Sequence, residues 1–378
     1  MRPHDTLSKL AACHEEGLVN DETEEAKTID EAAQQRGADH RCVHGLASRM
    51  CGSTSCLRHL ETFGRGSRSG SVIVTATPTR PARRNGPRRN ALTARGTRTA
   101  FVLSGGASLG ALQVGMLQAL YERAITPDFL VATSVGALNA AFIASRPQTP
   151  VTARELARIW RNLGREDIFP VSLNALVGGF CGRRDHLVPD RGLRQLLRRY
   201  LDFQDLADAA IPLHLVAFDL TEGRELLLSA GPAVDAVAAA ASIPGIFPPV
   251  DVADRRLIDG GVVNNTPISH AVDLGAERIY VLPTQDPGRL PRRPPQSALD
   301  AAMYGVRLLI DGRFRADVAR YSREAELVLL PAPNSAGVQP TNFDQSGDLI
   351  GQALEAARTR LAEHTAGRHL RLVSTGVG

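Results

Sequence analysis

Lysine is almost absent from this sequence of 378 residues. Lys9 and Lys27 are the only two, so arginine carries nearly all of the positive charge. Schiff-base chemistry and a phosphate-loop lysine are therefore excluded beyond residue 27. Aromatic residues make up only 4% of the chain, whereas hydrophobic residues make up 43%. The core must accordingly be built from alanine, leucine, valine and isoleucine.

The sequence also lacks a run of about 18 apolar residues, an apolar signal-peptide segment and any cysteine spacing typical of a zinc site. Four of the five cysteines lie in the first 56 residues, and a disulfide framework requires a secretory context. We therefore expect a cytoplasmic protein without a transmembrane helix or a metal site.

The first 97 residues lack sustained periodicity and are predicted to be a disordered extension. Residues 62–98 carry nine arginines and no acidic residue. A basic run of this kind can attract nucleic acid or anionic lipid. Because no aromatic or amphipathic pattern accompanies it, a solvated arm is the favoured interpretation. Peripheral contact with an anionic membrane is the alternative, and no nucleic-acid partner is expected.

From residue 98, short apolar runs alternate with segments of helical spacing. The expected strands cover residues 99–104, 129–133, 214–218, 225–228, 256–258, 278–282 and 327–330. The expected helices cover residues 109–123, 135–145, 234–241, 267–274, 298–319 and 347–363. This alternation predicts an α/β fold with a mainly parallel sheet. We place its core at residues 98–290, with residues 291–378 packed on it as a segment of helices and a strand.

Ser134 lies between an apolar run and an alanine-rich helical segment, with the small residues Ala132 and Gly136 two positions to either side. This pattern is typical of a nucleophile elbow, because the strained turn needs small residues around the serine. The helix N-terminus behind the serine would favour developing negative charge. An ordinary serine at a helix N-cap has the same local pattern.

Residues 105–110, with the sequence Gly-Gly-Ala-Ser-Leu-Gly, follow the first expected strand and open the first helix. No acid ends the next strand, as a dinucleotide-binding fold requires, and no lysine follows Gly110, as a phosphate loop requires. The N–H groups of Gly105, Gly106 and Ala107 are instead suited to bind a tetrahedral oxyanion. Of these residues, Gly106 is expected to need an unusual φ. A tight strand-to-helix turn is the alternative.

Asp259 follows the apolar run 256–258 and precedes Gly260 and Gly261. Two glycines after an acid permit another group to approach closely, although an Asp-Gly hairpin turn would look the same. His270 is the histidine that a Ser–His–Asp triad would use. Because it falls in an expected helix, a surface or capping role is favoured for it.

In order and spacing, four segments resemble the patatin-like phospholipases: residues 103–120, 132–141, 241–249 and 259–261. The resemblance runs from about residue 99 to 282 and, more weakly, to about 361. It implies a three-layer α/β/α fold and a lipid or ester substrate, without a metal or organic cofactor. It also implies a Ser–Asp dyad of Ser134 and Asp259. The implied oxyanion loop is residues 105–110, and the supporting motif glycines are Gly110, Gly136, Gly260 and Gly261.

Three residues depart from the family pattern: Ala107 replaces the third loop glycine, Leu109 a basic residue, and Ala132 the first elbow glycine. The small Ala107 can still donate its N–H, whereas the lost basic residue leaves the preference for a phosphate headgroup open. The predicted function is hydrolysis of lipid acyl esters. A non-catalytic lipid-binding protein and a short-chain carboxylesterase are the alternatives.

Residues 191–201 form a basic amphipathic segment. One face carries the apolar residues Leu193, Leu196, Leu197, Tyr200 and Leu201. This face can rest on anionic lipid or pack on the sheet, and packing is the favoured interpretation.

Overall fold

The structure is a computed structural model that describes residues 74–76, 97–170, 185–288, 295–296, 298–333, 338–339 and 341–374. All of them belong to one compact unit, residues 68–378. The strands are β1 (Val74–Ala76), β2 (Thr99–Leu103), β3 (Phe129–Thr133), β4 (Leu213–Asp219), β5 (Arg224–Leu228), β6 (Val250–Val252), β7 (Arg255–Asp259), β8 (Arg278–Leu282) and β9 (Glu326–Leu329).

The helices include two short 3-10 turns, η1 (Ala107–Leu109) and η2 (Leu206–Asp208). The α-helices are α2 (Gly110–Glu122), α3 (Val135–Ala144), α4 (Pro150–Asn162), α5 (Arg165–Ile168), α7 (Arg191–Tyr200), α8 (Ala233–Ala240), α9 (Gly261–Asn264), α10 (Ile268–Asp273), α11 (Ala298–Tyr321) and α12 (Ser346–Ser374).

The strands form one mixed sheet in the order β1-β5-β4-β3-β2-β8-β9, with β7 beside β4 and β6 beside β7. The strands β4, β3, β2, β8 and β9 are parallel, whereas β1, β5, β6 and β7 each pair antiparallel with their neighbours. The predicted mainly parallel sheet is confirmed. Carboxyl ends of the parallel strands meet at one edge, where loops of an open α/β sheet form ligand sites.

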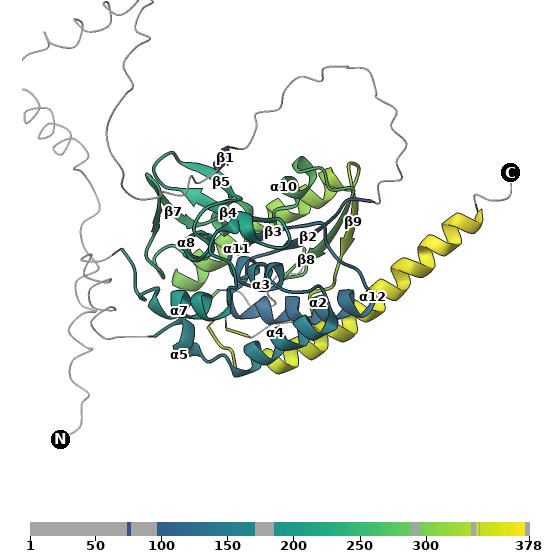
Figure 1. Cartoon of the computed structure of the whole chain (residues 1–378), viewed down its shortest axis with the longest axis horizontal. Coiled ribbons are helices and arrows are strands. Elements are labelled where there is room, and N and C mark those ends of the chain that lie inside the picture. The colour runs from purple at the N-terminus through teal and green to yellow at the C-terminus, as the bar shows by residue number, and fades with distance from the viewer. Residues whose placement is uncertain are drawn as a thin grey trace, which may run out of the picture. The chain divides into compact units, whose positions relative to one another are not determined.

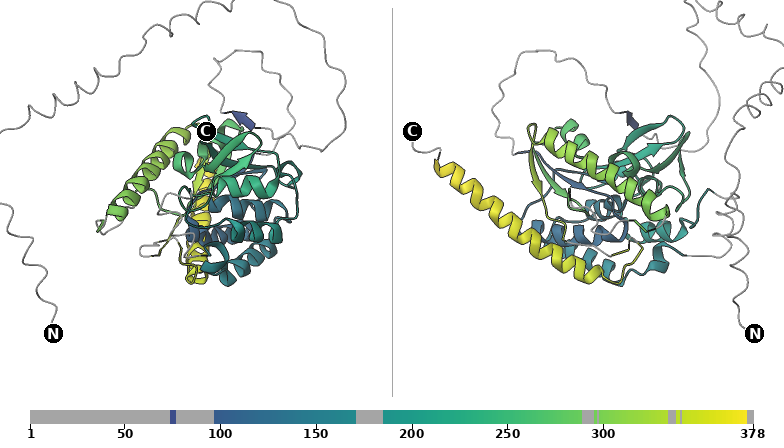
Figure 2. Two further views of the ribbon diagram at one scale, coloured as in Figure 1. Left: turned by 90° about the vertical axis from the view of Figure 1, so that its left-hand side faces the viewer. Right: turned by 180° about the vertical axis from the view of Figure 1, so that it is seen from behind.

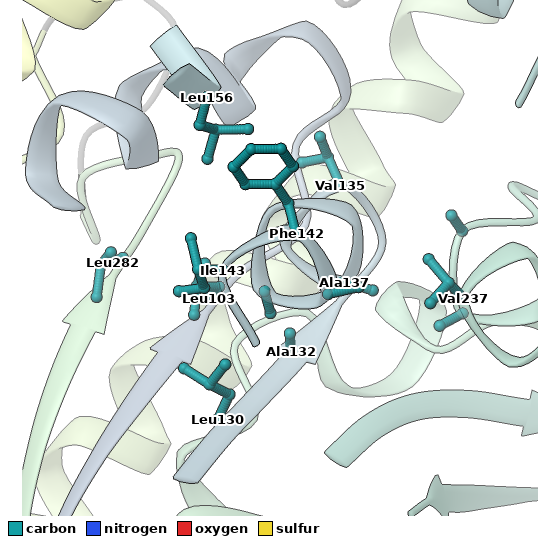
Figure 3. Close-up of a cluster of buried hydrophobic side chains, with 14 of the residues drawn as sticks. Leu103, Leu130, Ala132, Val135, Ala137, Phe142, Ile143, Leu156, Val237 and Leu282 are labelled. Carbon is teal, nitrogen blue, oxygen red and sulfur yellow. The ribbon is translucent and has the colours of Figure 1, made fainter. Parts of the chain in front are cut away.

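Helices cover both faces of the sheet (Figures 1 and 2), which confirms the three-layer α/β/α fold. In β2, Phe101 and Leu103 face the apolar cluster that contains α2 and α3. Ala100 and Val102 face the second cluster, on the side of α10 and α11. Burial on both faces explains why the central strands β2 and β3 are continuous buried runs instead of alternating. Figure 3 shows residues of the first cluster, where Leu103 and Leu130 of the sheet lie beside Ile143 of α3.

Every expected strand and helix is present, with bounds that shift by a few residues. The largest shift is at α12, which continues to Ser374, whereas the expected helix ended at residue 363. The sequence did not predict α4, although Pro150 at its first turn is a start signal and its buried residues recur at helical spacing.

The strand β1 lies inside the segment that was predicted to be disordered. Its three residues pair antiparallel with β5, from Val74 opposite Leu228 to Ala76 opposite Leu226. Other residues of the extension before Thr97 lie outside the described residues. The disorder of the extension therefore stays a prediction, with β1 as an ordered exception.

Two elements of the C-terminal segment share the layers of the core. The strand β9 pairs with β8. The helix α12 packs against α2, where a Cβ atom on Gly115 would lie 2.2 Å from the carbonyl oxygen of Ile350. In the described part of the chain, no helix combines the length and the apolarity needed to cross a membrane.

Candidate active site

Ser134 forms a sharp turn between β3 and α3. Its backbone has φ 56° and ψ −129°, a conformation that is costly for a residue with a Cβ atom. The turn brings Gly136 so close to β2 that a Cβ atom there would lie 2.4 Å from the carbonyl oxygen of Leu103. Ser134 stands at the N-cap position of α3, but its side chain makes no cap hydrogen bond, so it is not an ordinary capping serine. A strained serine between a strand and a helix is the geometry of a nucleophile elbow.

The sheet register explains how Ser134 meets Asp259. Thr133, the last residue of β3, pairs with Val216 of β4. The next residue of β4, Ala217, pairs instead with Asp259, the last residue of β7. Because β3 is parallel to β4 and β7 is antiparallel to it, the two strands follow one another along the same edge of β4. Their carboxyl ends therefore meet, and Ser134 and Asp259 stand where they meet.

Asp259 is 4% exposed and accepts hydrogen bonds from the Ser134 hydroxyl and, at 2.7 Å, from the N–H of Gly261. Burial raises the pKa of the Asp259 carboxyl from 3.8 to about 6, and the two hydrogen bonds only partly offset this effect. Among the described residues, no basic side chain forms an ion pair with Asp259. Its carboxylate can consequently take up a proton near neutral pH.

The predicted oxyanion loop does not offer all three of the expected donors. The N–H of Gly105 donates to the carbonyl oxygen of Asn265 at 3.0 Å, so the prediction that it binds an oxyanion is unsupported. The N–H groups of Gly106 and Ala107 have no acceptor among the described residues. Two free donors thus remain in the loop. The loop lies next to Ser134, because a Cβ atom added to Gly105 would lie only 2.9 Å from Cβ of Ser134.

The backbone of the loop also corrects the expectation of an unusual φ at Gly106. Its φ of 162° is extended, whereas Ala107 has the left-handed φ of 51°. Gly106 is required for a different reason: a Cβ atom there would lie 2.3 Å from Oγ1 of Thr284. The position with the left-handed φ is thus the one at which the sequence has alanine instead of the family glycine.

The four motif glycines all permit close approaches of neighbouring groups. An added Cβ atom would lie 2.5 Å from a side-chain atom at Gly110, 2.6 Å from the backbone of β4 at Gly260, and 2.9 Å from a side-chain atom at Gly261. Gly136 makes the contact with β2 described above. Leu109 lies in the apolar core, so no basic side chain stands at that position of the loop.

A buried polar relay, missed by the sequence analysis, supports the loop from behind. Nε2 of Gln113 donates to the carbonyl oxygens of Ser104 (2.7 Å) and Leu282 (3.1 Å). Its Oε1 accepts from Nδ2 of Asn139 at 2.9 Å, and Oδ1 of Asn139 accepts from the indole N–H of Trp160 at 2.9 Å. Isolated Gln and Asn residues on helices carry no sequence signal for such a relay, because its partners come from four separate elements.

An apolar pocket of about 90 Å³ lies next to the serine, and Ser134 and Ala107 form part of its wall. Five of its wall residues are the apolar residues of the amphipathic segment formed by α7 and the residue after it: Leu193, Leu196, Leu197, Tyr200 and Leu201. Leu193 and Leu197 are buried in the main apolar cluster, so the predicted packing of this face is confirmed, but the neighbours of α7 are α5 and α8 instead of the sheet. Elsewhere in the wall, Phe169 stacks on Phe247 at 5.3 Å between ring centroids.

Two histidines of the core, His270 and His214, contact other side chains. Nε2 of His270 lies 2.6 Å from Oε1 of Glu225, and Nδ1 of His214 lies 2.7 Å from Oγ of Ser229. His270 is 5% exposed, so its predicted surface role is wrong. It projects from α10 to Glu225 of β5 and is not hydrogen-bonded to the serine or to the Asp259 carboxylate. Within the described ranges, no group of three His, Cys, Asp or Glu side chains could hold a metal ion.

Residues 101–272 match the model of the patatin-like phospholipase family. The chain contains a patatin-like phospholipase domain. The match spans the strands and helices that carry Gly105, Ser134 and Asp259, although it does not by itself assign their roles.

Relatives of this domain occur in longer proteins. Mouse patatin-like phospholipase domain-containing protein 7 is 28% identical over 195 residues, which are 50% of this chain and 14% of that protein. Lysophospholipase NTE1 of Mycosarcoma maydis is 25% identical over 259 residues, which are 66% of this chain and 12% of that protein. The chain thus spans a small part of the length of these relatives. The solved structure of VipD from Legionella pneumophila has a TM-score of 0.35 and 13% identity, covering 69% of this chain and 67% of that chain.

Proposed function

We propose that this patatin-like domain hydrolyses acyl esters of lipids, with Ser134 as nucleophile and Asp259 as the group that accepts its proton. One observation carries the proposal. The hydroxyl of a strained serine is hydrogen-bonded to a buried carboxylate, at the wall of an apolar pocket. A nucleophile needs an adjacent base, and an acyl chain needs an apolar site, so the arrangement supplies both requirements of the reaction.

In the first half of the reaction, Oγ of Ser134 attacks the ester carbonyl carbon while its proton passes to the Asp259 carboxylate. The tetrahedral oxyanion accepts hydrogen bonds from the N–H groups of Gly106 and Ala107. When the intermediate collapses, the bond from carbon to the alcohol oxygen breaks. The departing alcohol takes the proton from Asp259 and leaves the acyl group on Ser134.

The second half repeats these steps with water. Asp259 accepts a proton from the water as its oxygen attacks the acyl-serine carbonyl carbon. Collapse breaks the bond to Oγ of Ser134, which regains the proton from Asp259, and the fatty acid leaves. The pKa of about 6 suits both the uptake and the release of a proton by Asp259, since the carboxyl is largely ionised at neutral pH and its protonated form is still accessible.

The proposed substrate class is a lipid with a single long acyl ester, such as a lysophospholipid. The apolar wall of the pocket favours an acyl chain, and one of the relatives is named a lysophospholipase. A short-chain carboxylesterase would use the same chemistry with a different dependence on chain length. A non-catalytic lipid-binding protein would bind the same ligands without turnover.

Labelling with a fluorophosphonate probe separates the enzyme from the lipid-binding alternative. The wild-type protein should be labelled, and the Ser134→Ala variant should not. Hydrolysis of p-nitrophenyl esters from butyrate to palmitate, followed by a lysophospholipid, then separates the two hydrolases. Rising kcat/KM with chain length supports the lipid hydrolase. A protein that is folded and unlabelled, or that cleaves only the butyrate ester, contradicts the proposal.

A further inference from the structure

Thr284 lies in the segment that follows β8, and it contacts the oxyanion loop. It is 1% exposed, and its Oγ1 donates to the carbonyl oxygen of Gly105 at 2.5 Å. The side-chain amide of Asn265 donates to the same oxygen at 3.3 Å. The N–H of Thr284 donates in turn to Oγ of Ser104 at 2.9 Å, which fixes the backbone from which the hydroxyl projects.

The carbonyl that Thr284 holds belongs to the same peptide unit as the N–H of Gly106. This unit is planar and trans, because the described residues contain no cis peptide bond. Its C=O and N–H therefore point in opposite directions. With the oxygen turned to Thr284 and Asn265, the N–H of Gly106 points away from them, and it has no acceptor of its own among the described residues.

The preceding peptide unit is held at both ends as well. Its carbonyl, at Ser104, accepts from the amide of Gln113 at 2.7 Å, and its N–H, at Gly105, donates to the carbonyl oxygen of Asn265 at 3.0 Å. Rotation of the Gly105–Gly106 unit is therefore limited by the bonds that its carbonyl oxygen accepts from Thr284, from Asn265 and, at 3.3 Å, from Oγ of Ser104. Of these three, Thr284 makes the shortest bond.

We propose that Thr284 is a positioning residue for the oxyanion site: its hydroxyl holds the Gly105 carbonyl so that the Gly106 N–H is aimed at the acyl oxygen of a substrate on Ser134. This inference rests on the proposed function. The hydroxyl also polarises the peptide unit, because a hydrogen bond accepted by a carbonyl strengthens the donor on the same unit. Donors that are fixed before the reaction stabilise a developing oxyanion without reorganisation.

The same contact explains why residue 106 is glycine. Thr284 fills the space that a side chain there would occupy, since an added Cβ atom would lie 2.3 Å from Oγ1 and 2.5 Å from Cβ of Thr284. Residue 106 must therefore lack a side chain if the Thr284 hydroxyl is to reach the Gly105 carbonyl and orient the peptide.

The test compares Thr284→Val, which replaces the hydroxyl by a methyl group of similar size, with Thr284→Ser, which keeps the hydroxyl. On a soluble p-nitrophenyl ester, Thr284→Val should lower kcat by about 10-fold with KM nearly unchanged, because the lost interaction acts on the transition state. Thr284→Ser should restore kcat to within about 3-fold of the wild type, on the same reasoning. Where Thr284→Val does not fold, Thr284→Ala replaces it, with the same loss expected.

A second measurement isolates the oxyanion. A trifluoromethyl ketone with the same acyl chain forms an adduct with Ser134 whose oxygen occupies the oxyanion site. Its affinity should fall in Thr284→Val by the same factor as kcat, as expected of a transition-state analogue. A purely structural role for Thr284 would lower the melting temperature and leave this affinity unchanged per folded protein.

Thr266→Val is the matched control. Thr266 is also a buried threonine, close to Asn265, and its hydroxyl donates to no described group of the loop. It should keep kcat. Full kcat in a folded Thr284→Val, or an equal loss in Thr266→Val, overturns the inference and leaves the proposed function intact. A wild-type protein that hydrolyses no ester overturns both.

Discussion

The carboxylate of Asp259 accepts a hydrogen bond from the hydroxyl of Ser134, and no described histidine is hydrogen-bonded to either of them. The pairing follows from the sheet, because β3 and β7 meet end to end along β4. His270, the residue that a triad would use, is held instead by Glu225 at 2.6 Å. Among the described residues, the side chain bonded to the Ser134 hydroxyl is thus a carboxylate, as the proposed dyad requires.

Substitutions in the dyad provide the first prediction. Ser134→Ala and Asp259→Asn should each lower kcat on a soluble ester by at least ~10³-fold, because the two residues act as one unit. His270→Gln should leave kcat nearly unchanged, although the loss of its contact with Glu225 is expected to lower the melting temperature. Near-normal turnover in Asp259→Asn, or a collapse in His270→Gln, would assign the base role to the histidine.

The pH dependence of turnover is the second prediction. Asp259 accepts a proton only when it is ionised, and its pKa is raised to about 6. The value of kcat/KM should therefore rise with pH through about 6 and reach a plateau above it, since this parameter reports the free enzyme. Hydrolysis of a p-nitrophenyl ester from pH 4.5 to 8, followed at the isosbestic wavelength, measures the profile. A midpoint near 4 would mean that the carboxyl is solvated in the working enzyme.

Much of the fold could be predicted from sequence, because it depends on local patterns, whereas the pairing of Ser134 with Asp259 was expected only from the family resemblance. Apolar runs and helical spacing indicated the parallel core, and small residues around Ser134 and after Asp259 indicated a close approach. These signals are carried by neighbours within a few positions of each residue.

The properties of the oxyanion loop could not be predicted, because they depend on residues far away in the chain. Asn265 occupies the N–H of Gly105, and Thr284 explains why residue 106 is glycine. Both follow strands that become neighbours of the loop only in the folded sheet. A pattern of glycines shows that space or flexibility is needed, but it does not show which neighbour requires it.

Ala107→Gly is the third prediction. Ala107 has a φ of 51°, where a Cβ atom costs about 1 kcal/mol relative to glycine. The substitution should therefore raise the free energy of unfolding slightly, by up to about 1 kcal/mol, with part of the gain lost to the greater freedom of glycine in the unfolded chain. The kcat should stay within about 2-fold, because the N–H that is proposed to donate to the oxyanion is kept. A destabilised or inactive variant would show that the methyl group in the pocket wall is needed.

Truncation of the N-terminal extension is the fourth prediction. Removing residues 1–73 keeps β1, whereas removing residues 1–97 also removes β1 and the arginines from Arg80 to Arg95. Both proteins should hydrolyse a soluble ester normally, with a small loss of melting temperature in the shorter one. Co-sedimentation with phosphatidylglycerol vesicles should weaken in the shorter protein, most clearly at low salt, where charges are least screened. An insoluble or inactive truncation to residue 98 would show that the extension is structural.

The last prediction concerns the stability cost of the buried carboxylate. The folded pKa of Asp259 is about 6 and lies above the ordinary 3.8, so between these values the folded protein binds more protons than the unfolded chain, and stability falls as pH rises. The destabilisation of the folded protein by the ionised Asp259 is absent below about pH 4 and complete above about pH 6. A pKa difference of about two units corresponds to roughly 3 kcal/mol of stability.

Asp259→Asn removes the charge, so it should raise the melting temperature at pH 8 while it abolishes turnover, and this gain should vanish at pH 4. Asp251→Asn, at an exposed position in β6, is the control that should change neither. A variant that is equally destabilised at both pH values would mean that the carboxylate stabilises the fold through its hydrogen bonds to Ser134 and Gly261 more than its burial costs.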